Sequence, residues 1–210
     1  MLLSLSDLSK KHGLRARGVL HLGAHLGEEA NEYDAFGIES VLWVEGNPGV
    51  CSRLRESVGG RTGHQVLEGA ISESDDEEVE FHIASNSFSS SLLRMKLHRE
   101  KHPDVTEVMT VRVNTVTVDT LLSRHKIDPG KFDLLVMDLQ GAELKALIGM
   151  EKSLCMVRHI ITEVNTEELY QGCALLPGLQ RHLEARGFSL FEVKMWSDWH
   201  AWGDAFFSRT

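Results

Sequence analysis

The alternation of short apolar runs with helical segments constrains the fold of this chain more than any other feature. Apolar runs at residues 18–23 and 41–44 each end in a turn and lead into segments of helical polarity, at residues 28–36 and 49–58. Parallel strands require such crossovers, whereas antiparallel strands can be joined by a short hairpin. We therefore expect a doubly wound α/β fold, in which helices cover both faces of a mainly parallel sheet.

The rest of the chain continues this pattern with one interruption. Further strands are expected at residues 65–67, which lead to the segment 68–71, and at residues 132–137, 159–163, 189–194 and 205–208. Further helices are expected at residues 119–126, 142–150 and 178–186. Residues 132–137 form the most continuous apolar run, which is typical of a central strand buried on both faces. Residues 79–83 and 111–118 instead alternate between apolar and polar side chains, which indicates antiparallel or peripheral strands.

Length and composition favour a single domain over residues 1–210, with a polar insertion or lid at about residues 84–110. The formal net charge of −9 would repel a phosphate backbone, so nucleic acid is not an expected partner. No apolar run is long enough to cross a bilayer, and the first residues do not resemble a secretion signal. The three cysteines are widely spaced, which favours reduced thiols. We expect a soluble, cytoplasmic protein.

Ligands of such sheets bind beyond the carboxyl ends of the strands. A glycine turn, His21-Leu-Gly-Ala-His-Leu-Gly27, follows the first strand, and Glu45 ends the second. A carboxylate at Glu45 can accept both hydroxyl hydrogens of a ribose. The three-glycine dinucleotide pattern and the P-loop pattern are both absent. An adenosine ligand without phosphates, S-adenosylmethionine, therefore agrees best with the residues, although the two glycines also suit a plain strand-to-helix turn.

Two acids follow the most buried strand. Asp138 ends it, and Glu143 falls in the first turn of the next helix, where a negative charge is favoured by the helix dipole. Glu143 is equally interpreted as a helix-start acid. An unpaired carboxylate at the position of Asp138 is costly unless it binds an amine, a reacting hydroxyl or a metal.

Five segments together resemble the successive motifs of FkbM-type methyltransferases. They are His21-Leu-Gly-Ala-His-Leu-Gly27, Val44-Glu-Gly-Asn-Pro48, Ser89-Ser-Ser-Leu92, Val116-Thr-Val-Asp119 and Asp138-Leu-Gln-Gly-Ala-Glu143. The resemblance implies a class I methyltransferase (Rossmann-like) fold, with a seven-stranded sheet whose last strand is antiparallel. It also implies methyl transfer from S-adenosylmethionine to a hydroxyl of a carbohydrate or a small natural product. Two positions depart from the family pattern, because acids usually stand where this chain has His21 and Gln140.

The resemblance also implies site residues. Those expected to bind the cofactor are His21, Gly23, Ala24, Gly27, Glu45, Gly46, Ala70, Ile71, Ser89 and Asp138. Those expected near the acceptor are Ser90, Ser91, Gln140, Glu143, Glu163 and Trp199. The serines alternatively form a turn whose hydroxyls cap nearby backbone.

Methyl transfer to a hydroxyl needs alignment and a group that removes the proton. Asp138 is the first candidate for this base, and His25 is the second because imidazole titrates near neutrality. No metal site is expected, because His98 and His102 lack the remaining residues of a His-Glu-x-x-His motif and have no evident third ligand.

A cluster of aromatic residues precedes the last strand. The cluster consists of Trp196, Trp199 and Trp202, with Asp198 and His200. Its aromatic faces and neighbouring acid could stack against a sugar, and they could equally fill the edge of a core or form a homo-oligomer contact. Two other functions stay open. A nicotinamide-dependent oxidoreductase would share Glu45 but should carry the missing third glycine, and a non-catalytic binding module would bind the cofactor without turnover.

Overall fold

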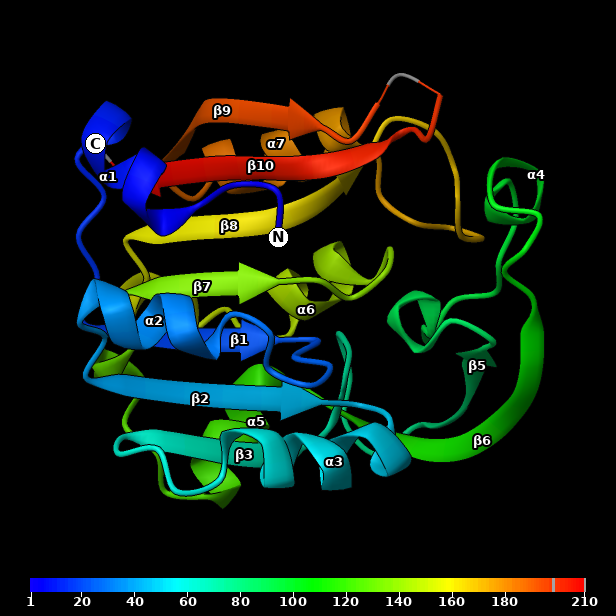
Figure 1. Cartoon of the computed structure of the whole chain (residues 1–210), viewed down its shortest axis with the longest axis horizontal. Helices are drawn as coiled ribbons and strands as arrows, with labels where there is room; N and C mark the ends of the chain where they lie inside the picture. Colours follow the sequence, from blue (N-terminus) through cyan, green and yellow to red (C-terminus); the bar gives the residue numbers. More distant parts are fainter. Residues whose placement is uncertain (198, 210) are drawn as a thin grey trace.

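The protein is described by a computed structural model that places residues 1–197 and 199–209. A seven-stranded sheet with the strand order β3-β2-β1-β7-β8-β10-β9 runs through its centre (Figure 1). Its strands are β1 (Gly18–Leu22), β2 (Ser40–Glu45), β3 (His64–Glu68), β7 (Leu134–Met137), β8 (His159–Asn165), β9 (Phe188–Met195) and β10 (Trp202–Arg209). Only β10 runs antiparallel to its neighbours, β8 and β9. The predicted seven-stranded, mainly parallel sheet with an antiparallel last strand is confirmed.

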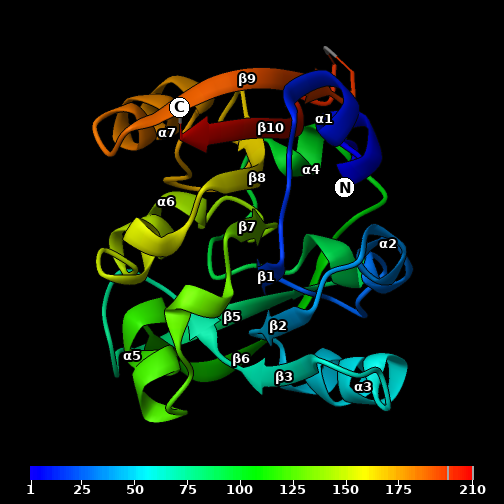
Figure 2. The same cartoon turned by 90° about the vertical axis from the view of Figure 1, so that its left-hand side faces the viewer.

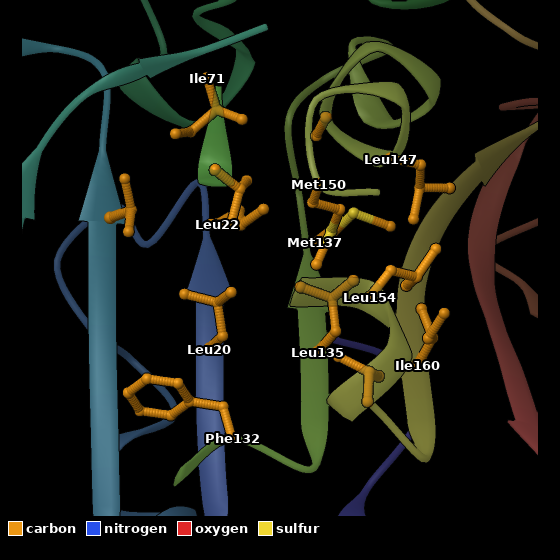
Figure 3. Close-up of a cluster of buried hydrophobic side chains, with 14 of the residues drawn as sticks. Leu20, Leu22, Ile71, Phe132, Leu135, Met137, Leu147, Met150, Leu154 and Ile160 are labelled. Atoms are coloured by element: carbon orange, nitrogen blue, oxygen red, sulfur yellow. The ribbon is translucent and has the colours of Figure 1, made fainter. Parts of the chain in front are cut away.

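Helices cover both faces of this sheet (Figure 2). On one face lie α1 (Leu5–His12), α2 (Ala30–Phe36) and α3 (Pro48–Val58), and on the other lie α5 (Val118–Arg124), α6 (Glu143–Ile148) and α7 (Leu176–Glu184). Successive residues of a strand therefore pack into two hydrophobic cores, one on each face of the sheet. Leu20 and Leu135 of neighbouring strands pack on the α5–α7 side with Leu147 of α6 (Figure 3), whereas Val19 and Leu134 pack on the other side.

A second, three-stranded sheet stands beyond the carboxyl ends of the parallel strands (Figure 1). It has the order β4-β6-β5 and comprises β4 (Ala70–Ile71), β5 (Glu78–Ala84) and β6 (Glu107–Val116). The pairing of β5 with β6 is antiparallel, as the sequence predicted. The strand expected at residues 65–67 is β3. Beyond it the chain leaves the main sheet at Gly69, and β4 pairs with β6.

Some element boundaries differ from those expected. The strand predicted over residues 111–118 ends at Val116, because the Thr117 hydroxyl accepts a hydrogen bond from the amide of Thr120 and caps α5. Helix α7 begins at Leu176, two residues before the expected start. Cys51 and Cys173 are buried as free thiols, but Cys155 is exposed.

The polar segment expected to form a lid is partly ordered by contacts with the segment after β8. It contains the short 3₁₀ helix η1 (Ser87–Ser89) and helix α4 (His98–Lys101). The amides of Lys96 and His98 both donate to the carbonyl of Leu169. Two further 3₁₀ helices, η2 (Pro129–Lys131) and η3 (Ser153–Met156), connect elements of the main sheet. Every helix among the described residues is too short or too polar to traverse a bilayer.

Candidate active site

Two adjoining cavities lie at the carboxyl ends of the parallel strands. The first is lined by the turn after β1, by the ends of β2 and β7 and by the η1 segment. The turn after β1 depends on Gly23, which has φ +78°. A Cβ added at this position would lie only 1.8 Å from the carbonyl oxygen of Asp138. The amides of Gly23 and Ala24 donate to the carbonyl of Val44, 2.9 and 3.1 Å away. Only glycine permits this close approach of β1 and β7.

Glu45 ends β2 and lines the first cavity, although only 7% of its surface is exposed. One carboxylate oxygen accepts a hydrogen bond from the amide of His25 at 2.9 Å, and the other accepts from the amide of Asn47 at 2.7 Å. Burial raises the pKa of this carboxyl above its usual range. Each oxygen keeps acceptor capacity beyond these single bonds, so the carboxylate can also receive a pair of ligand hydroxyls.

The remaining walls of the first cavity are mostly apolar. Gly46, Ala70, Ile71, Phe81 and Leu139 contribute to them, and none of the lining residues in the described part of the chain is lysine or arginine. Binding a pyrophosphate normally requires cations or several free amides. The lining instead offers apolar walls to a flat ring and carboxylates that can accept from a diol or face a positive charge.

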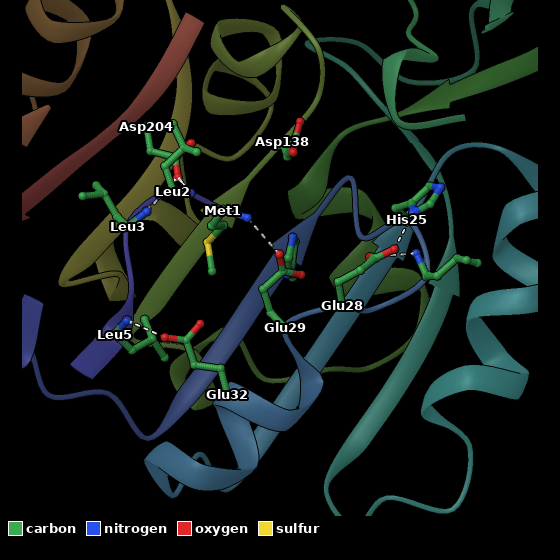
Figure 4. A network of polar contacts seen from close by, with 12 residues as sticks. Met1, Leu2, Leu3, Leu5, His25, Glu28, Glu29, Glu32, Asp138 and Asp204 are labelled. Carbon is green, nitrogen blue, oxygen red and sulfur yellow. Dashed lines mark hydrogen bonds and ion pairs between the residues drawn. The ribbon is translucent and has the colours of Figure 1, made fainter. Parts of the chain in front are cut away.

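His25 joins the glycine turn to η1. Its Nδ1 lies 2.7 Å from Oε1 of Glu28, and its Nε2 lies 2.8 Å from the hydroxyl of Ser87. Its ring packs against Phe88, with 3.9 Å between centroids and 32° between the ring planes. The contact with Glu28 is visible in Figure 4. Both ring nitrogens are thus engaged, which makes His25 a link between the turn and the overlying segment.

Asp138 lines both cavities, together with Gln140 and Phe88. The amide nitrogen of Gln140 donates to Asp138 and, at 2.7 Å, to Oε2 of Glu163. The amide oxygen of Gln140 accepts from the hydroxyl of Tyr170 at 2.7 Å. Gln140 therefore bridges two carboxyl groups. The sequence showed only that glutamine stands where the family usually has an acid, and did not predict this bridge.

The environment of these carboxyls favours their neutral forms. Desolvation raises the pKa of Asp138 to about 6. Desolvation, followed by the charge of Asp138, raises the pKa of Glu163 well above its usual range. Such shifts are typical of catalytic carboxyl groups, but structural networks produce them too. Asp138 is the more readily ionised member of the pair and the one that borders both cavities.

Glu143, expected near the acceptor, lines neither cavity. Its Oε1 accepts from the amides of Leu139 and Gly141, 2.8 and 3.2 Å away, and so fixes the loop after β7. The side chain is buried, and desolvation raises its pKa to about 7. The prediction for Glu143 is corrected accordingly: it shapes the loop that carries Gln140.

His21 is also corrected. The penultimate position of β1 directs its ring away from the cavities and against the stacked pair of Tyr33 and Trp43, and Nδ1 lies 3.0 Å from the Tyr33 hydroxyl. Burial lowers the pKa of this imidazole to about 4. Gly27 likewise packs away from the cavities, against Leu54 and Val58 of α3. The side chain of buried Ala24 is not part of the lining either.

The three serines divide between the two cavities. Ser90 and Ser91 line the first, and Ser89 lines the second. The Ser91 hydroxyl donates to the carbonyl of Gln140 at 2.9 Å, and the Ser90 hydroxyl accepts from the amide of Ala84 at 3.1 Å. These bonds support the alternative interpretation of the serines as turn-capping residues.

The second cavity has a volume of about 500 Å³. Sequence reasoning anticipated Glu163 there but missed Asp204 and Tyr170, which come from β10 and from the segment after β8. Figure 4 shows the position of Asp204 relative to Asp138. Trp199, expected near the acceptor, is 67% exposed and is not part of the lining, whereas Trp196 and Trp202 are. The expectation for Asp198 lies outside the described residues.

Among the described residues, no group of three or more His, Cys, Asp or Glu side chains is arranged to hold a metal ion. His98 and His102 do lie together, with 4.7 Å between ring centroids, and both line the second cavity.

Comparison with known proteins connects this arrangement to a family. Residues 21–190 match the methyltransferase FkbM domain. The 2-O-methyltransferase NoeI of Sinorhizobium fredii is 27% identical over 162 residues, and the match covers 73% of this chain but only 65% of that protein.

Solved structures show the same fold. Magnesium protoporphyrin IX methyltransferase (ChlM) from Synechocystis PCC 6803, with bound SAM, superposes with a TM-score of 0.53 at 11% identity, over 98% of this chain and 76% of that one. Ribosomal protein L11 methylase from Lactobacillus delbrueckii subsp. bulgaricus gives 0.51 at 12% identity, with the same coverages of 98% and 76%. The expected class I methyltransferase fold is confirmed. Since the matched domain spans most of its length, the chain belongs to the FkbM methyltransferase family.

Proposed function

We propose that the protein is an S-adenosylmethionine-dependent O-methyltransferase that acts on a hydroxyl group of a carbohydrate or a small natural product. One observation carries the proposal. A carboxyl group, Asp138, borders both a cavity without lining cations and a much larger second cavity. A cofactor in the first cavity and an acceptor in the second would therefore meet at Asp138.

The first cavity suits the cofactor chemically. Glu45 would accept the ribose hydroxyls, and Ile71 and Phe81 would contact the adenine. The free volume, about 50 Å³, is smaller than the roughly 300 Å³ at the lower end of small-molecule sites, so part of the lining, which includes Ser87 and Phe88, would have to move when the cofactor binds. Phe88 is 56% exposed, so its outward displacement exposes little further apolar surface. Ser87 and Phe88 are thus the part of the predicted lid that would move on binding, whereas Ser91 is held by two backbone hydrogen bonds to His82.

The bound cofactor supplies a methyl group on a positively charged sulfur, a carbon already activated for in-line displacement. The chain itself has to align the hydroxyl and take its proton. Asp138 stands at the junction and would accept that proton as the new carbon–oxygen bond forms. Gln140 holds the Asp138 carboxylate from one side, which leaves its other lone pairs free for the acceptor.

The alternatives are separated by binding and turnover. Calorimetric titration should detect S-adenosylmethionine and S-adenosylhomocysteine but not NADH, and tight NADH binding would favour the oxidoreductase. Radiolabelled methyl transfer to a panel of glycans tests catalysis against a non-catalytic binding module. NoeI is named as a 2-O-methyltransferase, which supports the choice of hydroxyl acceptors. Cytoplasmic location and a homo-oligomer stay predictions from the sequence.

Replacing Glu45 tests the cofactor assignment directly. Glu45→Gln keeps the shape but removes the charge and one acceptor oxygen, so the affinity for S-adenosylhomocysteine should fall by about 1–3 kcal/mol, or about 5- to 150-fold. Glu68→Gln is a matched control, because Glu68 ends the adjacent strand in register with Glu45 but is exposed and lies outside the first cavity. Equal affinities of the two folded variants would remove Glu45 from the ribose site.

A further inference from the structure

The second cavity combines an acidic end with an aromatic and imidazole wall. The carboxyls of Asp138, Glu163 and Asp204 gather at one end. The rings of Trp196 and Trp202 stack on each other in the wall, 5.6 Å apart and 8° from parallel. This combination differs from the first cavity, where one carboxylate is held against apolar walls.

We propose that this cavity is the acceptor site and that it selects an uncharged sugar ring, packed against Trp196 and Trp202, over sugars that carry a carboxylate, phosphate or sulfate. This inference rests on the proposed function, since it assigns the acceptor to the hydroxyl that Asp138 would deprotonate.

His98 contributes a buried, uncharged imidazole to the wall of the cavity. It lines the cavity and is 5% exposed. Burial lowers the pKa of this imidazole to about 4, so the ring is neutral near pH 7 and adds no positive charge that would attract an anion.

The charges facing the cavity disfavour an anionic ligand. Met1 also lines it, and its amino group is paired with Glu29 at 3.1 Å (Figure 4). Desolvation raises the pKa of Asp138 only to about 6, so this carboxyl is ionised near pH 7. An anion placed beside Asp138 would meet like charge in a poorly solvated site, and no lysine or arginine in the described part of the lining would offset it. A sugar ring, in contrast, offers hydroxyls to the polar groups and apolar C–H faces to the tryptophans.

Saturation-transfer NMR on protein saturated with S-adenosylhomocysteine tests the assignment. The probes are methyl glycosides of neutral hexoses and deoxyhexoses, each offered beside the corresponding uronate or sugar phosphate. We expect signals from neutral glycosides, with each anionic counterpart bound at least about tenfold more weakly, which corresponds to an unfavourable interaction of about 1.4 kcal/mol. Equal binding of the anionic probes, or no signal from any neutral glycoside, would overturn the inference.

Two tryptophan variants localise the binding. Trp196→Ala should weaken binding of the neutral glycoside about fivefold, since aromatic contacts of this kind contribute about 1 kcal/mol. Trp199→Ala is the matched control, because Trp199 is exposed like Trp196 but lies outside the cavity. Equal losses in the two variants would contradict the assignment. Calorimetry with S-adenosylhomocysteine separates the two proposals: if the cofactor binds and the glycosides do not, only this inference fails.

Discussion

The Asp138→Asn variant is expected to lose about two to four orders of magnitude in kcat, because an amide cannot accept the proton of the attacking hydroxyl. The amide oxygen can still accept the hydrogen bond from Gln140, so the geometry at the junction of the cavities should persist. S-adenosylhomocysteine lacks the positive charge of the cofactor, and its affinity should therefore stay close to that of the unchanged protein. Single-turnover methyl transfer and calorimetry together measure these two quantities.

The pH dependence gives the same assignment a second test. Desolvation raises the pKa of Asp138 to about 6, and only its ionised form can take up a proton. The kcat of the unchanged protein should therefore rise as the pH increases through about 6, and this rise should be absent from the residual activity of Asp138→Asn.

Asp133→Asn is the matched control for this variant. Asp133 lies at the opposite end of β7, where it accepts hydrogen bonds from the amides of Arg17 and Gly18, and it lines neither cavity. It should retain normal kcat in its folded form. Near-normal kcat for Asp138→Asn would place the base elsewhere, with His25 the next candidate.

The sheet was predictable from the sequence because both its apolar runs and its turns are local signals. The central position of residues 132–137 followed from their continuous apolar character, and β7 does lie in the middle of the sheet. Helix α1 was missed although its signals are present. Ser4 caps it by accepting from the amide of Asp7, and Gly13 ends it in the left-handed conformation.

The site was only partly predictable, because it depends on where side chains point. Glu45 ends β2 and Asp138 directly follows β7, so their place at the cavity edge follows from the sheet alone. His21 lies one residue before the end of β1, and that position sends its ring into the core beside Tyr33. No sequence pattern showed that the Gln140 amide would bridge two acids, since Glu163 is contributed by another strand.

The tryptophan cluster illustrates the same limit. Its three tryptophans are close in sequence, but Trp196 and Trp202 are stacked at the cavity whereas Trp199 stands outside it. Which of these tryptophans reach the cavity depends on how the chain turns between β9 and β10, and their spacing in the sequence does not reveal this turn.

Glu163→Gln is expected to make the protein more stable at pH 8 while leaving its stability near pH 4 almost unchanged. Desolvation and the nearby Asp138 charge raise the pKa of Glu163 in the folded chain well above the ordinary value of 4.5. Above pH 4.5 the unfolded chain gives up this proton and the folded chain keeps it, so the free energy of unfolding falls as the pH rises toward the folded pKa. Glutamine keeps an acceptor for Gln140 but does not titrate, which removes this loss.

The same linkage applies to the neighbouring carboxyls, so the unchanged protein should lose stability steadily between about pH 5 and pH 8. Asp138 and Glu143, with pKa values raised to about 6 and about 7, would each contribute on the order of 3 kcal/mol if they titrated independently. Their mutual interaction makes the combined effect smaller than that sum. Urea unfolding at a series of pH values, for the unchanged protein and for Glu163→Gln, measures both the slope and its reduction.

Glu192→Gln should behave in the opposite way and serves as the control. Hydrogen bonds from Lys11 and His12 lower the pKa of Glu192, so its contribution to stability is present above the unfolded pKa and disappears as the pH falls. Its replacement should cost at most about 1 kcal/mol near neutral pH, as for other surface ion pairs. If Glu163→Gln also lowered stability at pH 8, the buried carboxyl would be ionised in the folded protein and Glu163, rather than Asp138 alone, would be available to take the acceptor's proton.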